Sequence, residues 1–386
     1  MNRMPDPIDI AAPSPLLGGL SPRQFMRRHW QKKPLLVRAA LPGVTAPVAR
    51  GELFGLAASE DVESRLVRQD GARWTLRRGP LPRRALPPVA RPGWTLLVQG
   101  LDLHVPAAHE LLARFRFAPA ARLDDLMLSW ASDGGGVGPH VDSYDVFLLQ
   151  VQGRRRWRIG PPGDAALRPG LPLKILARFE PTEEWVLEPG DLLYLPPGWA
   201  HDGVAVGECM TASIGFRAPE RVGLAREVVG RLVDVATDGT TRPRLYRDPA
   251  QPATATPGRV PPALQRFAAR AAAELLRDGE TLHAALGEWL SEPASAVRFV
   301  PPDEGATLGP GVRLDAGSRM LYDDAHVFLN GESWRASGRD AALMRRLADH
   351  GALEARELRR ASPAARELLT QWLADGWVRM AGDDDG

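Results

Sequence analysis

Two side chains that can bind a metal follow a glycine-rich stretch near the middle of the chain. His140 and Asp142 lie in residues 134–160, separated by one residue, and the apolar segment 146–151 comes directly after them. In an extended chain, residues i and i+2 point to the same face, so the imidazole and the carboxylate converge on one side. One further ligand would complete a metal site.

His201 is the candidate for that third ligand. It follows a Pro-Gly turn at 189–190, a short apolar strand at 192–195 and a Pro-Pro-Gly break at 196–198, which directs the next residues back toward the first two ligands. Two neutral imidazoles and one carboxylate on one face of an octahedral ion leave three positions open. This is the ligand set of non-haem Fe(II) oxygenases, whose open positions take a bidentate cosubstrate and dioxygen.

An arginine run after the first two ligands indicates what the cosubstrate is. Arg155 has the same strand parity as the apolar Trp157 and Ile159, whereas the other arginines of the run have the opposite parity. If the apolar pair faces the core, Arg155 faces it too, and a buried guanidinium needs an anion. A dicarboxylate that chelates the metal through a 2-oxo acid end would offer its distal carboxylate to Arg155.

Four motifs together carry a resemblance to a known family. HVDSYD, GRRRW, PGDLLYLPPGWAH and SIGFRAP, in this order, resemble the JmjC-type ribosomal oxygenases, most closely the bacterial branch that hydroxylates an arginine of ribosomal protein uL16. The resemblance extends over nearly the whole chain. It implies a 2-oxoglutarate-dependent protein hydroxylase that holds Fe(II) on His140, Asp142 and His201, uses O2 as its second cosubstrate, and acts on the 3-carbon of that arginine.

Other residues near the motifs are candidates for the same site. Tyr144 and Asp145 follow the ligands closely and are expected to line the substrate entrance. Thr211 and Ser213 alternate on the strand after His201 and are expected to hydrogen-bond the cosubstrate. Ala131 stands where the bacterial members resembled here have a small hydroxyl residue, so one polar contact to the cosubstrate is missing or replaced.

Two alternative functions remain open. The nearer one is another JmjC reaction at the same site, either histidine hydroxylation or N-methyl demethylation. The more distant one is a non-catalytic, cupin-like module that only binds ribosomal components. The intact ligand triad beside Arg155 argues against this second alternative, because a binding module does not need an open iron site.

Composition bounds the remaining possibilities. At 386 residues the chain is expected to form two or three domains. A net charge of +2 gives no reason to expect nucleic-acid binding by bulk electrostatics. The single cysteine, Cys209, excludes an internal disulfide framework and indicates a reducing compartment. No signal-like or membrane-spanning apolar run is present, so we expect a cytoplasmic protein that does not bind membranes.

The first part of the chain is predicted to be mainly β. A helix begins at Ser21, a hairpin turns at Asp70-Gly71, and strands are expected at 94–100 and 173–180. Many short strands with Gly/Pro turns and no βαβ alternation indicate a double-stranded β-helix, that is, a jelly roll of the JmjC/cupin type. We assign residues 1–218 to this catalytic domain.

The second part is predicted to be helical first and mixed afterwards. Residues 219–310 contain an apolar helical stripe formed by Leu264, Phe267, Ala268, Ala271 and Leu275. The stripe can pack on the barrel or on a second protomer, and the family resemblance favours a homodimer through this helical dimerisation region.

A winged-helix-like domain is predicted for residues 311–386. Alternating strands turn at Asn330-Gly331, and helices are expected at 339–351, 352–361 and 362–376. Winged helices often read DNA with their last helix. Here that helix sets Arg366 against acidic neighbours and the tail is acidic, so we expect a structural or protein-docking role and no direct DNA binding.

Overall fold

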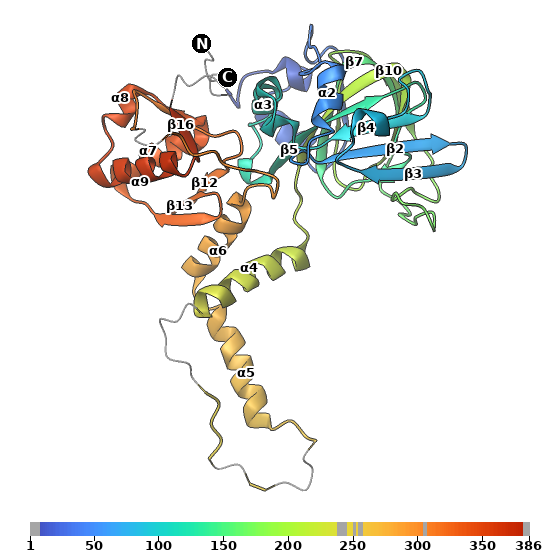
Figure 1. Ribbon diagram of the computed structural model, residues 1–386. Helices are drawn as coiled ribbons and strands as arrows, with labels where there is room; N and C mark the ends of the chain where they lie inside the picture. The colour runs from blue at the N-terminus through green and yellow to red at the C-terminus, as the bar shows by residue number, and fades with distance from the viewer. Residues whose placement is uncertain (1–7, 238–244, 250–251, 254–257, 304–306, 381–386) are drawn as a thin grey trace. The chain divides into compact units, whose positions relative to one another are not determined.

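The chain forms two compact units in a computed structural model that describes residues 8–237, 245–249, 252–253, 258–303 and 307–380 (Figure 1). One unit comprises residues 1–218 and 294–298, and the other comprises 219–293 and 299–386. Within the described residues, no helix is both long enough and apolar enough to cross a membrane.

The first unit is an antiparallel β structure with a few short helices. Its helices are α1 (Pro22–Arg28), α2 (Arg50–Leu56) and α3 (Pro106–Ala113). Its strands are β1 (Leu35–Val37), β2 (Ser64–Asp70), β3 (Arg73–Arg78), β4 (Trp94–Val98), β5 (Leu123–Ala131), β6 (His140–Val141), β7 (Asp145–Gly160), β8 (Glu183–Leu187), β9 (Leu192–Leu195) and β10 (Ala200–Phe216). Neighbouring strands follow the order β1-β9-β7-β10-β5-β4-β2-β3, with β6 on β10 and β8 on β7.

The two longest strands, β7 and β10, form the spine of this unit. They pair antiparallel over nearly their whole length, with register shifts near Met210. The first half of β7 also pairs with β9, and its second half pairs with β8, so β7 belongs to both halves of the jelly roll. Aromatic side chains fill the core, where Phe147 packs on Tyr194 and on Phe25 of α1. These observations confirm the predicted jelly-roll fold.

Several local predictions can be compared with the strands. The hairpin at Asp70-Gly71 and the strand from Trp94 are confirmed as β2–β3 and β4. The strand predicted over 173–180 is wrong, because this loop has only an isolated bridge between Leu167 and Leu176. Its apolar residues are buried by packing and not by sheet pairing.

The second unit begins with helices and ends with a small α/β structure. Its helices are α4 (Arg221–Thr237), α5 (Pro262–Leu275), α6 (Gly279–Ser291), α7 (Gly338–His350), α8 (Ala355–Leu358) and α9 (Pro363–Ala374). Its strands are β11 (Val312–Leu314), β12 (Met320–Tyr322), β13 (His326–Leu329), β14 (Glu332–Arg335), β15 (Ala352–Leu353) and β16 (Val378–Met380). The hairpin predicted at Asn330-Gly331 is confirmed as β13–β14, whereas the helix predicted over 352–361 is wrong in its first turn, which is β15.

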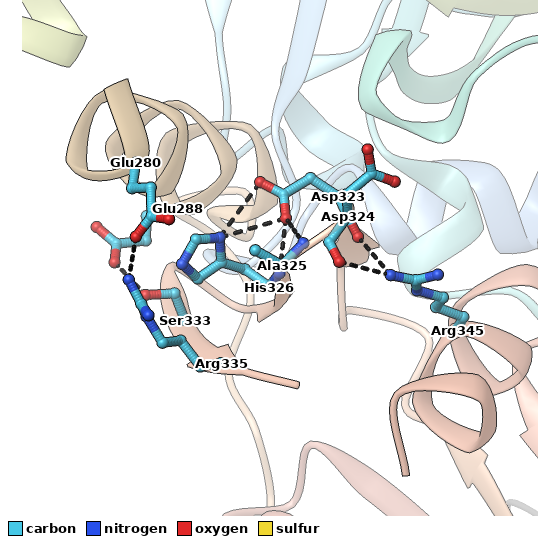
Figure 2. Close-up of polar contacts among 9 residues, drawn as sticks. All are labelled: Glu280, Glu288, Asp323, Asp324, Ala325, His326, Ser333, Arg335 and Arg345. Atoms are coloured by element: carbon cyan, nitrogen blue, oxygen red, sulfur yellow. Dashed lines mark hydrogen bonds and ion pairs between the residues drawn. The ribbon is translucent and has the colours of Figure 1, made fainter. Parts of the chain in front are cut away.

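Helix α6 packs against the β12–β14 sheet. A Cβ atom on Gly287 would lie 2.2 Å from the ring of Phe328, so only glycine lets the helix approach this closely. Figure 2 shows two polar contacts across the same junction, where the Ser333 hydroxyl donates to Glu288 at 2.5 Å and Arg335 pairs with Glu280. Because α6 and the sheet share these contacts, they form one structural element.

Helix α7 is tied to the turn before β13. Its Arg345 guanidinium donates to the backbone carbonyls of Asp323 and Asp324, and the Asp323 carboxylate contacts Nδ1 of the buried His326 (Figure 2). The four following elements close over a core centred on the fully buried Leu347 and Trp372. This arrangement is the predicted winged-helix type of fold.

Candidate metal centre

The register of two strands brings the predicted histidine ligands together. On β6 and β10, His140 lies directly opposite His201, as antiparallel Cα partners. The glycine-rich loop before β6 lies against β10, where a Cβ atom on Gly136 would be 2.6 Å from the carbonyl oxygen of Gly203. Any larger residue at 136 would push this loop, and with it His140, away from β10.

Asp142 completes the cluster. Its Oδ2 lies 3.5 Å from Nε2 of His201 and 3.8 Å from Nε2 of His140, and the two imidazole centroids are 4.2 Å apart. One ligand atom from each of the three residues lies within 4.8 Å of the other two. Three ligand atoms at these separations can converge on a single ion, in the ligand set that the sequence predicted.

Backbone contacts orient both imidazoles. Nδ1 of His140 lies 2.8 Å from the Gly138 carbonyl, and Nδ1 of His201 lies 3.0 Å from the Trp199 carbonyl. A carbonyl oxygen only accepts hydrogen bonds, so each Nδ1 carries a proton, and each Nε2 is the nitrogen that lies near Asp142 and would bind a metal.

Burial and neighbouring charges act on all three ligands. Burial, helped by His201, lowers the pKa of His140. Burial alone would raise the pKa of Asp142, but the hydrogen bond from His201 and the charge of His140 outweigh it and lower this pKa. For His201, burial would lower the pKa, but the Asp142 carboxylate outweighs it and raises the value. The carboxylate is therefore kept in the ionised form that binds metal.

Arg155 lies on the same interior face, as its parity predicted. It is 5% exposed and adjoins the buried Trp157, with its guanidinium carbon 5.9 Å from the ring centroid. Its Nη1 donates to the hydroxyl of Ser129 at 3.2 Å, whereas its Nε and Nη2 are buried without a partner. Nε and Nη2 form one edge of the guanidinium, the edge that binds a carboxylate through two parallel hydrogen bonds.

The metal cluster and Arg155 line one pocket. Its volume is about 420 Å³, and both Tyr144 and Ser213 are in its wall. Burial, followed by the charge of Asp142, raises the pKa of the Tyr144 hydroxyl, so this group remains a hydrogen-bond donor. Tyr144 and Ser213 therefore both line the pocket that holds the metal cluster.

Two other predicted site residues lie away from the pocket wall. The carboxylate of Asp145 is fully buried, accepts a hydrogen bond from Tyr194 at 2.6 Å and pairs with Arg122 at 3.0 Å. It holds the core together, and the entrance position predicted for it is wrong. The hydroxyl of Thr211 is also taken up inside the fold, where it donates to Gln150 at 2.8 Å.

Comparison with known proteins places this site in a family. Residues 110–224 match the model of the JmjC domain, and residues 274–379 match that of the ROXA-like winged helix. The chain is 35% identical over 325 residues to ribosomal protein uL16 3-hydroxylase of Escherichia coli K12, covering 80% of this chain and 84% of that protein. The chain belongs to the JmjC-type ribosomal oxygenases.

Solved structures of this family have the same fold over most of the chain. The E. coli ribosomal oxygenase YcfD matches with a TM-score of 0.80 at 31% identity, covering 92% of this chain and 97% of that one. A structure of YcfD in complex with cobalt and 2-oxoglutarate also has a TM-score of 0.80, covering 94% and 99%. A probable ribosomal oxygenase of Haemophilus influenzae is 38% identical over 204 residues, which are 52% of this chain and 50% of that protein.

Two pocket residues of this ribosomal oxygenase were missed by the sequence reasoning. Ser129, two residues before Ala131 on the same face of β5, accepts a hydrogen bond from Arg155. Asp125 lies in the same wall, where Gln99 and the backbone NH of Gly100 both donate to its Oδ2. The alternation of the segment LDDLMLSWA would have placed both on the interior face of β5.

Proposed function

We propose that this protein is an Fe(II)- and 2-oxoglutarate-dependent hydroxylase of ribosomal protein uL16, acting on an arginine at its 3-carbon. One observation carries the proposal: a histidine-aspartate-histidine cluster faces the same pocket as a buried guanidinium with an unpaired edge. The cluster is the donor set that Fe(II) takes in this enzyme class. The unpaired edge of Arg155 is matched by the distal carboxylate of 2-oxoglutarate.

The chain's own residues bind and orient the reactants. His140, Asp142 and His201 hold the metal, Arg155 binds the distal carboxylate, and Ser213 adds a hydroxyl in the same wall. With iron and 2-oxoglutarate bound, dioxygen gives one oxygen atom to the substrate C–H bond and the other to 2-oxoglutarate, which leaves as succinate and CO2. The protein contributes position and the exclusion of water.

The position and charge of Asp125 favour a substrate with a cationic side chain. Burial, followed by the charges of Asp102 and Asp124, raises the pKa of Asp125 to about 7. Among the described residues, both hydrogen bonds to this carboxyl group go to Oδ2, which leaves Oδ1 to bind a group in the pocket. A guanidinium is a suitable group, because it carries a permanent charge and donates through a planar fork. We therefore assign Asp125 and Tyr144 to the substrate side of the pocket.

This assignment predicts a pH dependence. The Asp125 carboxyl binds a guanidinium only when ionised, so kcat/KM for a uL16 peptide should fall as the pH drops through about 7. At about one pH unit below its pKa only about a tenth of the groups are ionised, so the expected decrease is about tenfold. Asp125→Asn should remove this acid limb and lower the plateau. If the decrease in kcat/KM below about pH 7 persisted unchanged in Asp125→Asn, Asp125 would not be the group that binds the substrate guanidinium.

Stability provides the control for this variant. The folded-state pKa of Asp125 is raised above its unfolded value, so ionisation destabilises the fold from about pH 4 upward, with the full effect above about pH 7. Asp125→Asn keeps an oxygen for the Gln99 and Gly100 hydrogen bonds and removes this charge. Its melting temperature at about pH 8 should therefore exceed that of the wild type, which separates lost substrate binding from misfolding.

The alternative reactions differ in the mass of their products. Purified protein with Fe(II), 2-oxoglutarate and oxygen would be given uL16, a histidine-containing ribosomal peptide or a methyl-lysine peptide, and both succinate and peptide mass would be measured. We expect succinate formation to rise with uL16 and the peptide to gain one oxygen atom. Loss of a methyl group would instead indicate demethylation, and neither succinate nor a mass change would favour the cupin-like binding module.

A homodimer is the second part of the proposal. Helix α5 has no buried residue, and its predicted stripe leaves Leu264 and Phe267 each 37% exposed (Figure 1). On neighbouring α4, Val222 and Val233 are also exposed. A second copy of the chain covering this stripe would bury these side chains.

The dimer can be tested with one charge. Phe267→Glu places a carboxylate in the proposed contact, so the molar mass measured by light scattering should fall to that of one chain. Arg266→Glu is the matched control at the neighbouring, exposed position of α5, which lies outside the apolar stripe. A wild type that is already monomeric at micromolar concentration would contradict the homodimer.

Three further assignments complete the proposal. We take 1–218 as the catalytic domain, 219–310 as the dimerisation region and 311–386 as the winged-helix-like domain, although α6 packs on the sheet of the last. We propose a protein-docking or structural role for that domain and no direct DNA binding, since Arg366 of α9 already donates to the Leu358 carbonyl. A uL16 substrate places the enzyme in the cytoplasm.

A further inference from the structure

One short segment carries a strong local excess of positive charge. Residues 64–91 contain eight arginines and a single acidic residue, Asp70, a net charge of 8 − 1 = +7. The whole chain has a net charge of +2, so the remainder carries 2 − 7 = −5. Asp70 is itself engaged by Arg91 at 3.4 Å. The segment comprises the β2–β3 hairpin, which forms one edge of the sheet (Figure 1), and the residues after it.

Strand register sorts the hairpin arginines onto two faces. Arg65 and Arg78 are direct cross-strand partners, and both line the pocket. On the opposite face, Arg68 lies across from Thr75, which has Arg73 and Arg77 two residues to either side. The last two are separated by four strand residues, or about 13 Å. Arg68, Arg73 and Arg77 therefore form a triangle of cations, here called the hairpin triad.

The guanidinium groups of the hairpin triad do not stabilise the fold through polar contacts. Among the described residues, no hydrogen bond or ion pair engages any of its three guanidinium groups, and Arg73 and Arg77 are exposed. Charged side chains often protect an edge strand from pairing with another protein. That explanation fits β3, which is the edge strand, but not Arg68, because β2 lies between β3 and β4. The three arginines of the hairpin triad repel one another, and no contact within the fold compensates for this repulsion.

We propose that the hairpin triad binds the phosphate backbone of RNA that accompanies the protein substrate. This step rests on the proposed function, since a ribosomal protein is the substrate that RNA would accompany. On the other face of the same hairpin, Arg65 and Arg78 line the pocket. RNA held by the hairpin triad would thus lie across the hairpin from the pocket that receives the arginine side chain.

The chemistry of the hairpin favours RNA over an acidic protein. All eight cations are arginines, whose planar fork matches phosphate oxygens bidentately and is weakly hydrated. Three guanidinium groups spread over about 13 Å match a regular polyanion, whereas one carboxylate could satisfy only one of them. Phosphate contacts of this kind need no base recognition, which agrees with a face that carries no aromatic side chain. Besides the hairpin triad, this face holds Thr75, the buried Leu66 and Asp70, which is the cross-strand partner of Arg73.

Salt-dependent binding tests the proposal. A fluorescein-labelled, single-stranded RNA of about 20 nucleotides exceeds the ~4–16 nucleotides of one such site. Its anisotropy would be followed with the full chain at several salt concentrations. Each phosphate contact adds about 0.7 to the slope of log affinity against log salt for a single strand. Replacing the hairpin triad by glutamine should reduce the slope by about 2 and weaken binding on the order of 100-fold at about 0.1 M salt.

A second triple variant separates this surface from net charge. Arg23, Arg27 and Arg28 are exposed on α1, which belongs to the same unit but not to the hairpin, and their replacement by glutamine removes the same charge. We expect this control to bind RNA nearly as the wild type does, and both variants to keep the wild-type melting temperature.

Three results would overturn the proposal: no RNA binding by the wild type, equal losses in the two triple variants, or displacement of the RNA by polyglutamate at equal charge. The last would identify an acidic protein as the occupant. Binding is measured without cosubstrate or uL16. A protein that binds RNA through the hairpin triad but leaves uL16 unmodified would therefore contradict the proposed hydroxylation and not the RNA site.

Discussion

Asp142→Ala should reduce hydroxylation to below about 1% of the wild-type rate while the jelly roll stays folded. Asp142 is the only anionic group of the metal cluster, and its Oδ2 lies within 3.8 Å of both histidine Nε2 atoms. Losing an outer hydrogen bond to a metal ligand costs ~10–100-fold in affinity or activity, so losing the ligand itself should cost more. Both imidazoles keep their backbone hydrogen bonds, so the fold should persist.

Metal content measured after dialysis distinguishes this effect from others. We expect wild-type protein to retain about one equivalent of iron or cobalt and Asp142→Ala to retain far less, with unchanged circular dichroism. Asp164→Ala serves as the control, because Asp164 is an exposed aspartate in the loop after β7. An Asp142→Ala protein that still turned over substrate would contradict the assignment of Asp142 as a metal ligand.

Arg155→Met should raise KM for 2-oxoglutarate by about 100-fold or more. The unpaired Nε and Nη2 offer two charge-assisted hydrogen bonds to the distal carboxylate. Each is worth ~1.5–3 kcal/mol, and 1.36 kcal/mol corresponds to a tenfold change. The value of kcat at saturating 2-oxoglutarate should change much less, since Arg155 does not belong to the metal cluster.

The same substitution should stabilise the protein in the absence of 2-oxoglutarate. Buried donors without partners cost ~1–3 kcal/mol each, and methionine fills a similar volume without them. Calorimetry should therefore find a higher melting temperature for cosubstrate-free Arg155→Met than for the wild type. Arg154→Met, one residue away on the exposed face, should alter neither KM nor stability. An unchanged KM for 2-oxoglutarate in Arg155→Met would show that Arg155 does not bind the distal carboxylate.

Alternation along strands explains why much of the site could be predicted. Residues 155, 157 and 159 are buried, whereas Arg154 and Arg156 are exposed, as the parity of the run requires. The same rule brings His140 and Asp142 to one face. Both inferences needed only the period of a strand and the presence of apolar neighbours.

Contacts between distant strands could not be read in this way. Proximity to the ligands suggested an entrance role for Asp145, but its carboxylate is taken up by Tyr194 and Arg122, which are 49 and 23 residues away. Ser129, whose hydroxyl accepts a hydrogen bond from Arg155, was not identified either, because the register of β5 against its neighbours decides which hydroxyl is within reach of the guanidinium.

Total charge concealed the local distribution. A net charge of +2 argued against nucleic-acid binding by bulk electrostatics, yet residues 64–91 alone carry +7. The sequence contained these arginines, but only the β2–β3 register shows that three of them share a face outside the pocket.

The most direct test of the central claim is mass spectrometry of uL16 after incubation with the protein, Fe(II), 2-oxoglutarate and isotopically labelled dioxygen. We expect one labelled oxygen atom on the 3-carbon of a single arginine, with an equal amount of succinate, and neither product without 2-oxoglutarate. Unmodified uL16 alongside measurable succinate would overturn the substrate, and an oxygen atom that carried no label would contradict the oxygenase chemistry itself.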